Sequence, residues 1–195
     1  MQSLPQWRGG QPTRVSATDE SGFTLVELMI TLAIAVVLVA IAVPSFRNIT
    51  LSNRLTTTTN DVVAALNTAR MEAIKRNGNV QFCSNSSSAN KADTSLGTQC
   101  GTSAGAVTAI TGAGKAQTVR DAVAGIAAPL QIKGDIKALR FNGQGLGALP
   151  GSSAPYDGQI IDICTDSLST DNHRTISIKA GWALKVDVGN GACAS

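Results

Sequence analysis

The chain has 195 residues, enough for one domain of ordinary size and an additional segment. Aromatic residues make up only 4% of it, while small residues are frequent, which argues against a large aromatic core. The net charge of +3 is too small to support nucleic-acid binding.

A polar segment, 1–22, precedes an apolar run, 23–43, that contains a single charged residue, Glu27. At a rise of 1.5 Å per residue this run forms a helix about 31 Å long, enough to cross a hydrocarbon core. A buried helix of a globular protein usually has a polar face, and this run is apolar all round. It is too long for the apolar region of a signal peptide and lacks a small-residue cleavage site behind it. The sequence therefore predicts a transmembrane helix over 23–43.

Glu27 lies about one turn from the start of this run. A charged side chain at mid-membrane costs about 2.5–3.5 kcal/mol on insertion scales, so such residues are rare and usually functional. Two interpretations are open. The carboxylate extends to the membrane interface, or it pairs with a cation inside the apolar layer. Cleavage after Gly22 would create such a cation, the α-amino group of Phe23.

The segment 22–27, GFTLVE, resembles the prepilin peptidase recognition motif of type IV pilins and type II secretion pseudopilins. The resemblance implies that the leader 1–22 is cleaved after Gly22 and that Phe23 becomes N-methylated. It also implies that Glu27 is the assembly carboxylate, which pairs with the N-terminus of a neighbouring subunit. The run ends at Pro44, as in the family.

One departure from the family lies just before the cleavage position. Asp19 and Glu20 stand where the family often has lysine or arginine, so positive charge on the cytoplasmic side is sparse. The predicted orientation, an inner-membrane helix with a periplasmic head, therefore rests on the resemblance.

Pro44 lacks a backbone donor and predicts a kink or local melting of the helix. Helical spacing continues beyond it, with one apolar stripe of Leu55, Val62, Leu66, Ala69 and Ala73. The threonines at 56–59 are poor helix formers, and Asn77-Gly78 is typical of a helix end. We expect one helix over about 23–77, whose amphipathic second half, 44–78, lies on a sheet.

The remaining chain, 79–195, carries strand patterns at 80–83, 139–141, 159–165, 174–179 and 182–188. In the last, Trp182, Leu184, Val186 and Val188 are expected to point inward. Residues 84–90 and 101–114 are rich in small residues and indicate surface loop or poorly ordered chain. Hairpin-type strands packed against one helix predict an α+β head with an antiparallel sheet.

The cysteines are Cys83, Cys100, Cys164 and Cys193, all beyond the apolar run. Their spacing lacks the tight cluster of ligands that a zinc site needs. An even number of scattered cysteines beyond a membrane anchor indicates two disulfides in an oxidising compartment. Four free buried thiols are the alternative, and the sequence leaves all three connectivities open.

Several head segments resemble the GspH/FimT-type branch of minor pilins and pseudopilins, namely 69–76, 80–83, 139–145, 161–164 and 174–178. The resemblance implies the type IV pilin fold, with the long N-terminal helix packed on the antiparallel head. It also implies the pairings Cys83–Cys100 and Cys164–Cys193.

Other motifs have simpler explanations. The glycine-rich segment 142–147 is expected to be a turn, because no strand-to-helix unit or P-loop lysine surrounds it. His173 is interpreted as part of a solvated loop, and Asp162 and Asp166 as strand-edge and turn residues rather than calcium ligands. We expect no catalytic residues, no metal and no cofactor, so the chain is not predicted to be an enzyme.

The leading functional hypothesis is a minor pilin that is incorporated into a type IV pilus or primes its assembly. A type II secretion pseudopilin is the alternative. DNA binding is disfavoured, because the G-R-x-R pattern of DNA-binding members is replaced by Gly-Trp-Ala-Leu-Lys at 181–185. The expected partners are other pilins, prepilin peptidase, assembly platform proteins and the inner membrane, before the subunit enters the filament.

Overall fold

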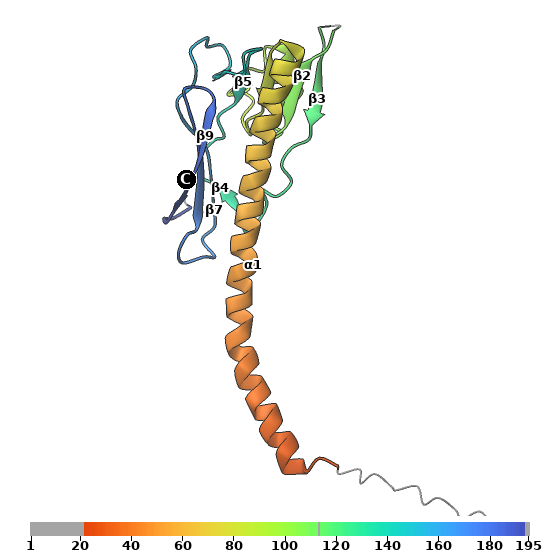
Figure 1. Ribbon diagram of the computed structural model, residues 1–195, viewed down its shortest axis with the longest axis vertical. Coiled ribbons are helices and arrows are strands. Elements are labelled where there is room, and N and C mark those ends of the chain that lie inside the picture. Colours follow the sequence, from red (N-terminus) through yellow and green to blue (C-terminus); the bar gives the residue numbers. More distant parts are fainter. Residues whose placement is uncertain (1–21, 113, 194–195) are drawn as a thin grey trace, which may run out of the picture. The chain divides into compact units, whose positions relative to one another are not determined.

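The computed structural model describes residues 22–112 and 114–193. The predicted leader lies outside them, apart from Gly22. The chain divides into two compact units between Ala42 and Val43. One long helix, α1 (Leu25–Arg76), precedes the strands (Figure 1). Because the strands pair antiparallel, the α+β prediction is confirmed.

The strands within the described residues form two sheets. The first has the order β3-β2-β1-β5-β6 and comprises β1 (Val80–Phe82), β2 (Val107–Ile110), β3 (Ala116–Arg120), β5 (Leu139–Phe141) and β6 (Gly147–Ala148). The second has the order β4-β7-β8-β9 and comprises β4 (Gln131–Ile132), β7 (Gly158–Cys164), β8 (His173–Lys179) and β9 (Ala183–Gly189). The sequence predicted one sheet. The alternation of apolar and polar residues identifies strands but not which strands pair. The division of the strands into two sheets therefore could not be predicted from it.

The second half of α1 supplies the helical side of the core. The predicted stripe residues Leu55, Val62, Leu66, Ala69 and Ala73 are all fully buried. They pack with buried residues of both sheets, including Phe82, Phe141, Ile161, Ile163, Ile176 and Ile178. Burying one large apolar side chain stabilises the fold by about 1.5–3 kcal/mol. The helix therefore joins the two sheets through a single core.

The helix is continuous where poor helix formers occur. It runs through Pro44 unbroken, so the local melting offered as one outcome there is not observed. It also runs through the threonines at 56–59. The Thr59 hydroxyl donates to the Leu55 carbonyl oxygen at 2.7 Å, and Thr58 and Thr59 are buried. Tertiary burial outweighs the weak propensity of these residues.

The end of α1 is as predicted. The Gly78 amide donates to the Ala73 carbonyl at 3.0 Å, and the Asn77 amide donates to the Ile74 carbonyl at 3.1 Å. This pair of bonds is the Schellman pattern, in which one residue adopts a left-handed conformation. Asn77 takes that position, with φ 46°.

The segments predicted as surface loop, 84–90 and 101–114, are partly structured instead. The second contains the strand β2, which is buried along most of its length, and the short helix α2 (Ser95–Cys100) lies between the two segments. The side chain of Thr94 caps α2 by accepting a hydrogen bond from the Gly97 amide at 3.2 Å. Ser84 and Asn90 are fully buried. Small polar residues can be buried here because their side chains form hydrogen bonds with backbone groups. Amino-acid composition does not show whether such bonds form.

The inward face predicted for the last strand is wrong for most of its residues. Trp182, Val186 and Val188 are 53%, 43% and 56% exposed, and only Leu184 packs against the core. β9 lies at the edge of its sheet, beside β8 alone. Alternation predicts two faces for a strand but not whether anything covers them.

Candidate processing and assembly site

The helix begins directly after the predicted cleavage position. The Thr24 hydroxyl accepts a hydrogen bond from the Glu27 amide at 3.2 Å, and the Thr24 carbonyl accepts one from the Leu28 amide at 3.1 Å. Thr24 is therefore the N-cap, and Thr-x-x-Glu matches the capping-box sequence. Gly22 and Phe23 precede the first helical turn.

The peptide bond between Gly22 and Phe23 is sterically accessible. Gly22 is exposed, and an added Cβ would meet nothing within 4 Å. Phe23 is 79% exposed. An endopeptidase must accommodate an extended chain on both sides of the bond it cuts. Residues outside the helix and free of tertiary contact meet that need.

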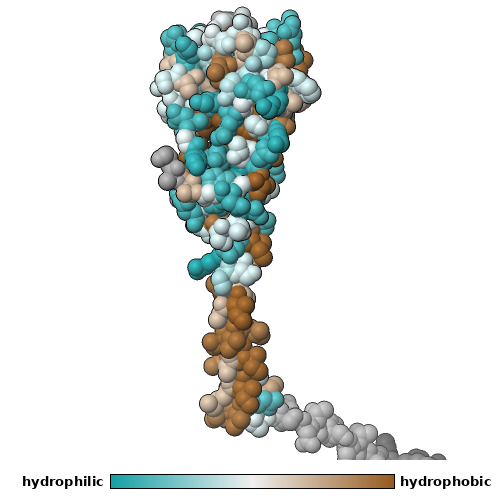
Figure 2. Space-filling model, turned by 90° about the vertical axis from the view of Figure 1, so that its left-hand side faces the viewer, coloured by the Kyte–Doolittle hydropathy of each residue, from teal (hydrophilic) through white to brown (hydrophobic). Residues whose placement is uncertain are grey.

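The N-terminal part of α1 exposes apolar side chains all round. Its most apolar 18-residue window has a mean hydropathy of 2.8, and none of it is buried. Figure 2 shows these side chains as a continuous hydrophobic surface, whereas the surface over the sheets is mostly hydrophilic. An exposed apolar surface of this extent marks contact with lipid or with other proteins. The length and composition of this segment meet the requirement for crossing a membrane.

The Glu27 carboxylate is the one charged group of this apolar segment. Within residues 22–112 and 114–193 it has no hydrogen bond and no ion pair, and only its backbone amide is engaged. The first turn of a helix favours a negative charge, since the backbone N–H groups there are unpaired. In lipid that interaction leaves most of the carboxylate unsatisfied. The described residues thus offer the Glu27 side chain no cation.

Two profiles match the sequence. The prokaryotic N-terminal methylation motif matches residues 18–43. The family described as type II transport protein GspH matches residues 58–186. The chain belongs to the GspH family.

A solved structure similar to this GspH-family chain is the type IV minor pilin FimU of Pseudomonas aeruginosa. It has 18% sequence identity and a TM-score of 0.44, and the alignment covers 71% of this chain and 92% of that one. No curated relative matches the chain. The family and the methylation motif together make the chain a pilin-like subunit with the membrane-type helix of that class.

Two disulfides join the cysteines of this GspH-family head. Cys83 follows β1 and is bonded to Cys100 at the end of α2, with a sequence separation of 17. Cys164 at the end of β7 is bonded to Cys193, with a separation of 29. The first bridge fastens α2 to the first sheet. The second fastens the C-terminal segment to the second sheet.

The glycine-rich segment 142–147 is the predicted turn. It connects β5 to β6, and the Asn142 carboxamide oxygen accepts bonds from the Gln144 and Leu146 amides, each at 3.0 Å. Gly145 has φ 77°, a left-handed conformation that glycine adopts without strain. The amides that a phosphate cradle would need are thus used within the turn.

A buried polar cluster between β1, β5 and α2 was not predicted. The Gln81 side-chain oxygen accepts two bonds from the Arg140 guanidinium, at 2.8 and 3.2 Å. The Gln81 amide donates to the Asn90 carbonyl at 2.9 Å. Burial lowers the pKa of Arg140, and nearby Asp93 opposes this effect. Gln81 and Arg140 are neighbours because β1 pairs with β5. The sequence did not predict that pairing, so it gave no sign of the cluster.

The interpretation of His173 as a solvated loop residue is wrong. His173 begins β8 and is 5% exposed, and its Nδ1 lies 2.9 Å from the Asp162 carboxylate. Asp162 is also buried, within β7 rather than at a solvated edge. Polar neighbours in sequence suggested a loop, but the pairing of β7 with β8 takes both residues inside. Asp166 follows β7, and its carboxylate accepts a bond from the Cys193 amide at 3.0 Å.

Proposed function

We propose that this chain is a minor pilin that co-assembles into a type IV pilus or primes its assembly. Prepilin peptidase removes residues 1–22, and the new N-terminus, Phe23, is methylated. The helix 23–43 holds the subunit in the inner membrane with the head, 79–195, in the periplasm. It then enters the filament core together with the helices of other pilins.

The observation that carries the proposal is Glu27, a carboxylate with no bonding partner among the described residues, on a helix segment with no buried residue. Cleavage after Gly22 creates an amine at Phe23, near the start of the same apolar segment. In a stack of parallel helices, that amine of one subunit lies at the level of Glu27 of the next. A charge-assisted bond of this kind contributes about 1.5–3 kcal/mol, and a dry environment leaves the carboxylate no alternative partner.

A second role for Glu27 must be separated from this one. As the glutamate of the Thr-x-x-Glu capping-box sequence, at the third helical position, it also favours the start of the helix. Glutamine serves that role as glutamate does but carries no charge. Glu27→Gln therefore tests pairing, whereas Glu27→Ala removes both roles.

The test follows the full-length chain through processing and assembly. Mass spectrometry of the mature protein is expected to find methyl-Phe23 at the N-terminus in the wild type and in both variants. Recovery of Glu27→Gln in filaments sheared from cells should fall about 10- to 100-fold, as 1.5–3 kcal/mol implies. Glu72→Gln, on the same helix beyond the apolar segment, is the matched control and should assemble normally.

Two results would overturn the mechanism. One is a filament-borne subunit that still carries residues 1–22. The other is normal incorporation of Glu27→Gln, which would leave Glu27 with a capping role only.

A type II secretion pseudopilin is the alternative, favoured by the description of the matching family as a type II transport protein. The chemistry of the N-terminus is the same in both. A deletion strain separates the two roles. Loss of surface pili with secretion intact supports the minor pilin, and loss of secretion with pili intact supports the pseudopilin.

DNA binding is not proposed. The segment 181–185, which runs into β9, contributes one basic residue, Lys185, and its ammonium group lies 2.7 Å from the Asp187 carboxylate. A neutralised lysine gives little attraction to phosphate. The proposed partners are thus other pilins, prepilin peptidase and the assembly platform.

A further inference from the structure

Three potential metal ligands gather on the second sheet, outside the processing and assembly site. Cys164 and His173 are directly opposite each other in the β7–β8 pairing. Asp162 is two residues before Cys164, so alternation places it on the same face of β7, opposite to the core residues Ile161 and Ile163. Cys193 reaches this face from the segment after β9. The sequence had offered no cluster, because Cys164, His173 and Cys193 are 9 to 29 residues apart along the chain.

The imidazole of His173 has one engaged nitrogen and one free nitrogen. Nδ1 lies 2.9 and 3.0 Å from the two oxygens of the Asp162 carboxylate. Nε2 is buried and has no hydrogen-bond partner in the described chain. A carboxylate at Nδ1 holds the proton there and leaves a lone pair on Nε2. A buried polar atom without a partner is rare in folded proteins and calls for a physical explanation.

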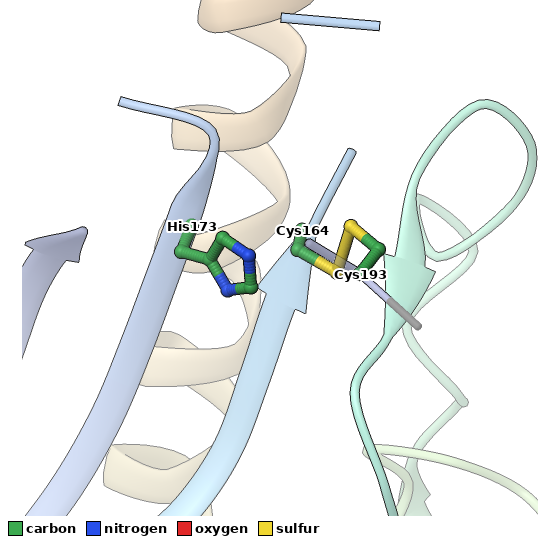
Figure 3. A group of neighbouring side chains, drawn as sticks. All are labelled: Cys164, His173 and Cys193. Carbon is green, nitrogen blue, oxygen red and sulfur yellow. A yellow bond between two sulfur atoms is a disulfide. The ribbon is translucent and has the colours of Figure 1, made fainter. Parts of the chain in front are cut away.

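The sulfurs lie close to this imidazole. One ligand atom from each of Cys164, His173 and Cys193 can be chosen so that all three lie within 4.8 Å of one another. Figure 3 shows the His173 ring pointing toward the disulfide. In a tetrahedral zinc site with Zn–S of about 2.3 Å and Zn–N of about 2.0 Å, the ligand atoms are roughly 3.5 Å apart. The Cα atoms of the cysteines are 5.7 Å apart. Side-chain rotation after reduction is therefore enough to form such a site.

The surroundings fit a metal ligand as well. A histidine that binds zinc usually donates its second ring N–H to a carboxylate, which fixes the tautomer, and Asp162 occupies that position. Gly191 lies beside the free nitrogen, and a Cβ there would come within 3.3 Å of Nε2. Glycine thus keeps the approach to Nε2 open.

We propose that, when Cys164 and Cys193 are reduced, these two thiolates and His173 Nε2 bind one Zn²⁺. Asp162 orients the imidazole, and water takes the fourth position. A dithiol reductant transfers two electrons and two protons to the disulfide and itself becomes a cyclic disulfide. Zn²⁺ then displaces the two thiol protons to solvent. The metal and the disulfide are alternative ways of holding the C-terminal segment on β7. They exclude each other because zinc binds the thiolate, and a sulfur in a disulfide is not a thiolate.

The test uses the full-length chain in detergent, reduced with a phosphine under anaerobic conditions and titrated with Co²⁺ as a spectroscopic probe for the zinc site. We expect one equivalent of Co²⁺ per chain, with a thiolate-to-cobalt charge-transfer band and the visible bands of a tetrahedral ion. Zn²⁺ should displace the cobalt. The oxidised protein should show no such bands.

Variants assign the ligands. The double variant Cys164→Ala/Cys193→Ala should lose the charge-transfer band. Asp162→Asn should weaken binding about 10- to 100-fold, the usual effect of removing the partner of a metal-bound histidine. The matched control is Cys83→Ala/Cys100→Ala, which removes the other cysteine pair and should keep the band.

The proposal is overturned if the folded, reduced chain shows no charge-transfer band, or if the band survives in Cys164→Ala/Cys193→Ala. Reduction can also unfold the head, which circular dichroism detects. Refolding on addition of Co²⁺ then supports the site, because metal binding and folding are coupled. A reduced chain that stays unfolded in excess Co²⁺ counts against it.

Discussion

Single residues at the ends of α1 have roles set by local chemistry. Thr24 caps the start of the helix through its hydroxyl, and Asn77 ends it in a left-handed conformation. Asn77 was identified from the sequence, whereas Thr24 was not singled out there, although helix termini use few residue types for clear steric and hydrogen-bonding reasons. The roles proposed for Gly22 and Glu27 also rest on residues that lie close together along the chain.

Asn77 provides a test at this scale. Asn77→Ala should destabilise the fold by up to about 1–2 kcal/mol, because the short polar side chain of asparagine lowers the cost of the left-handed region, whereas alanine bears that cost in full. Asn77→Gly is the control, and it should be neutral or slightly stabilising. Urea midpoints of the full chain in detergent measure both. Equal midpoints for the alanine and glycine variants would contradict the role of the φ angle.

At the level of elements, α1 unites two different surfaces in one helix. Its first part exposes apolar residues all round, and its second part buries one stripe against two sheets. The change from uniform to periodic apolarity was visible in the sequence. The strands β1, β5, β7, β8 and β9 were found from the same kind of pattern, whereas β2 lies in a segment predicted as loop. The pattern did not tell which strand faces are covered, as the exposed Val186 and Val188 show.

The buried stripe predicts a large effect at Leu66, which is fully buried. Leu66→Ala should lower the free energy of unfolding by about 2–5 kcal/mol, through lost burial and the cavity left behind. Asn67→Ala, at the exposed neighbouring position, should change it by less than about 0.5 kcal/mol. Denaturant unfolding of the two variants makes the comparison. A small loss for Leu66→Ala would mean that the helix does not pack as described.

The last turns of α1 carry an ion pair with a defined pH dependence. Arg76 Nε donates to the Glu72 carboxylate at 2.7 Å, and this bond lowers the pKa of Glu72; burial opposes the shift and Lys75 adds to it. The resulting stability is present above the pKa of Glu72 in the unfolded chain. It is lost as the pH falls through the lower pKa of the folded state.

Arg76→Gln should therefore raise the pKa of Glu72 toward its ordinary value and reduce stability at neutral pH by about 0.3–0.5 kcal/mol. An NMR titration of the Glu72 carboxyl carbon measures the shift. Lys133→Gln is the control and should leave that titration unchanged, because the Lys133 ammonium group donates to the Ala192 carbonyl and not to Glu72. An unchanged pKa in Arg76→Gln would show that the pair is not formed in solution.

On the scale of the whole molecule, the proposed function places the two compact units in different environments, the first in the membrane and the second in water. The buried apolar residues of the described chain all lie between Leu55 and Cys193, within the second unit. The described part of the first unit, 22–42, contributes apolar surface and no buried residue. Assembly and folding therefore depend on separate parts of the chain.

A chain that starts at Val43 should accordingly be soluble without detergent and keep the thermal midpoint of the full-length head within a few degrees. Circular dichroism and size-exclusion chromatography measure this. The truncated chain should also fail to enter filaments. Aggregation of the truncated chain, or a large fall in its thermal midpoint, would show that residues before Val43 contribute to the stability of the head.

The sequence by itself determined the N-terminal features: the helix, its apolar segment, the cleavage motif and the carboxylate at Glu27. These depend on residues close together along the chain, where periodicity and residue chemistry are sufficient. Only the tertiary structure decided the division into two sheets, the exposure of β9 and the meeting of Asp162, Cys164, His173 and Cys193. The physical reason is that strand pairing and the packing of elements over a sheet face bring together residues that are distant in the sequence. Such contacts produce no pattern among neighbouring residues of the chain.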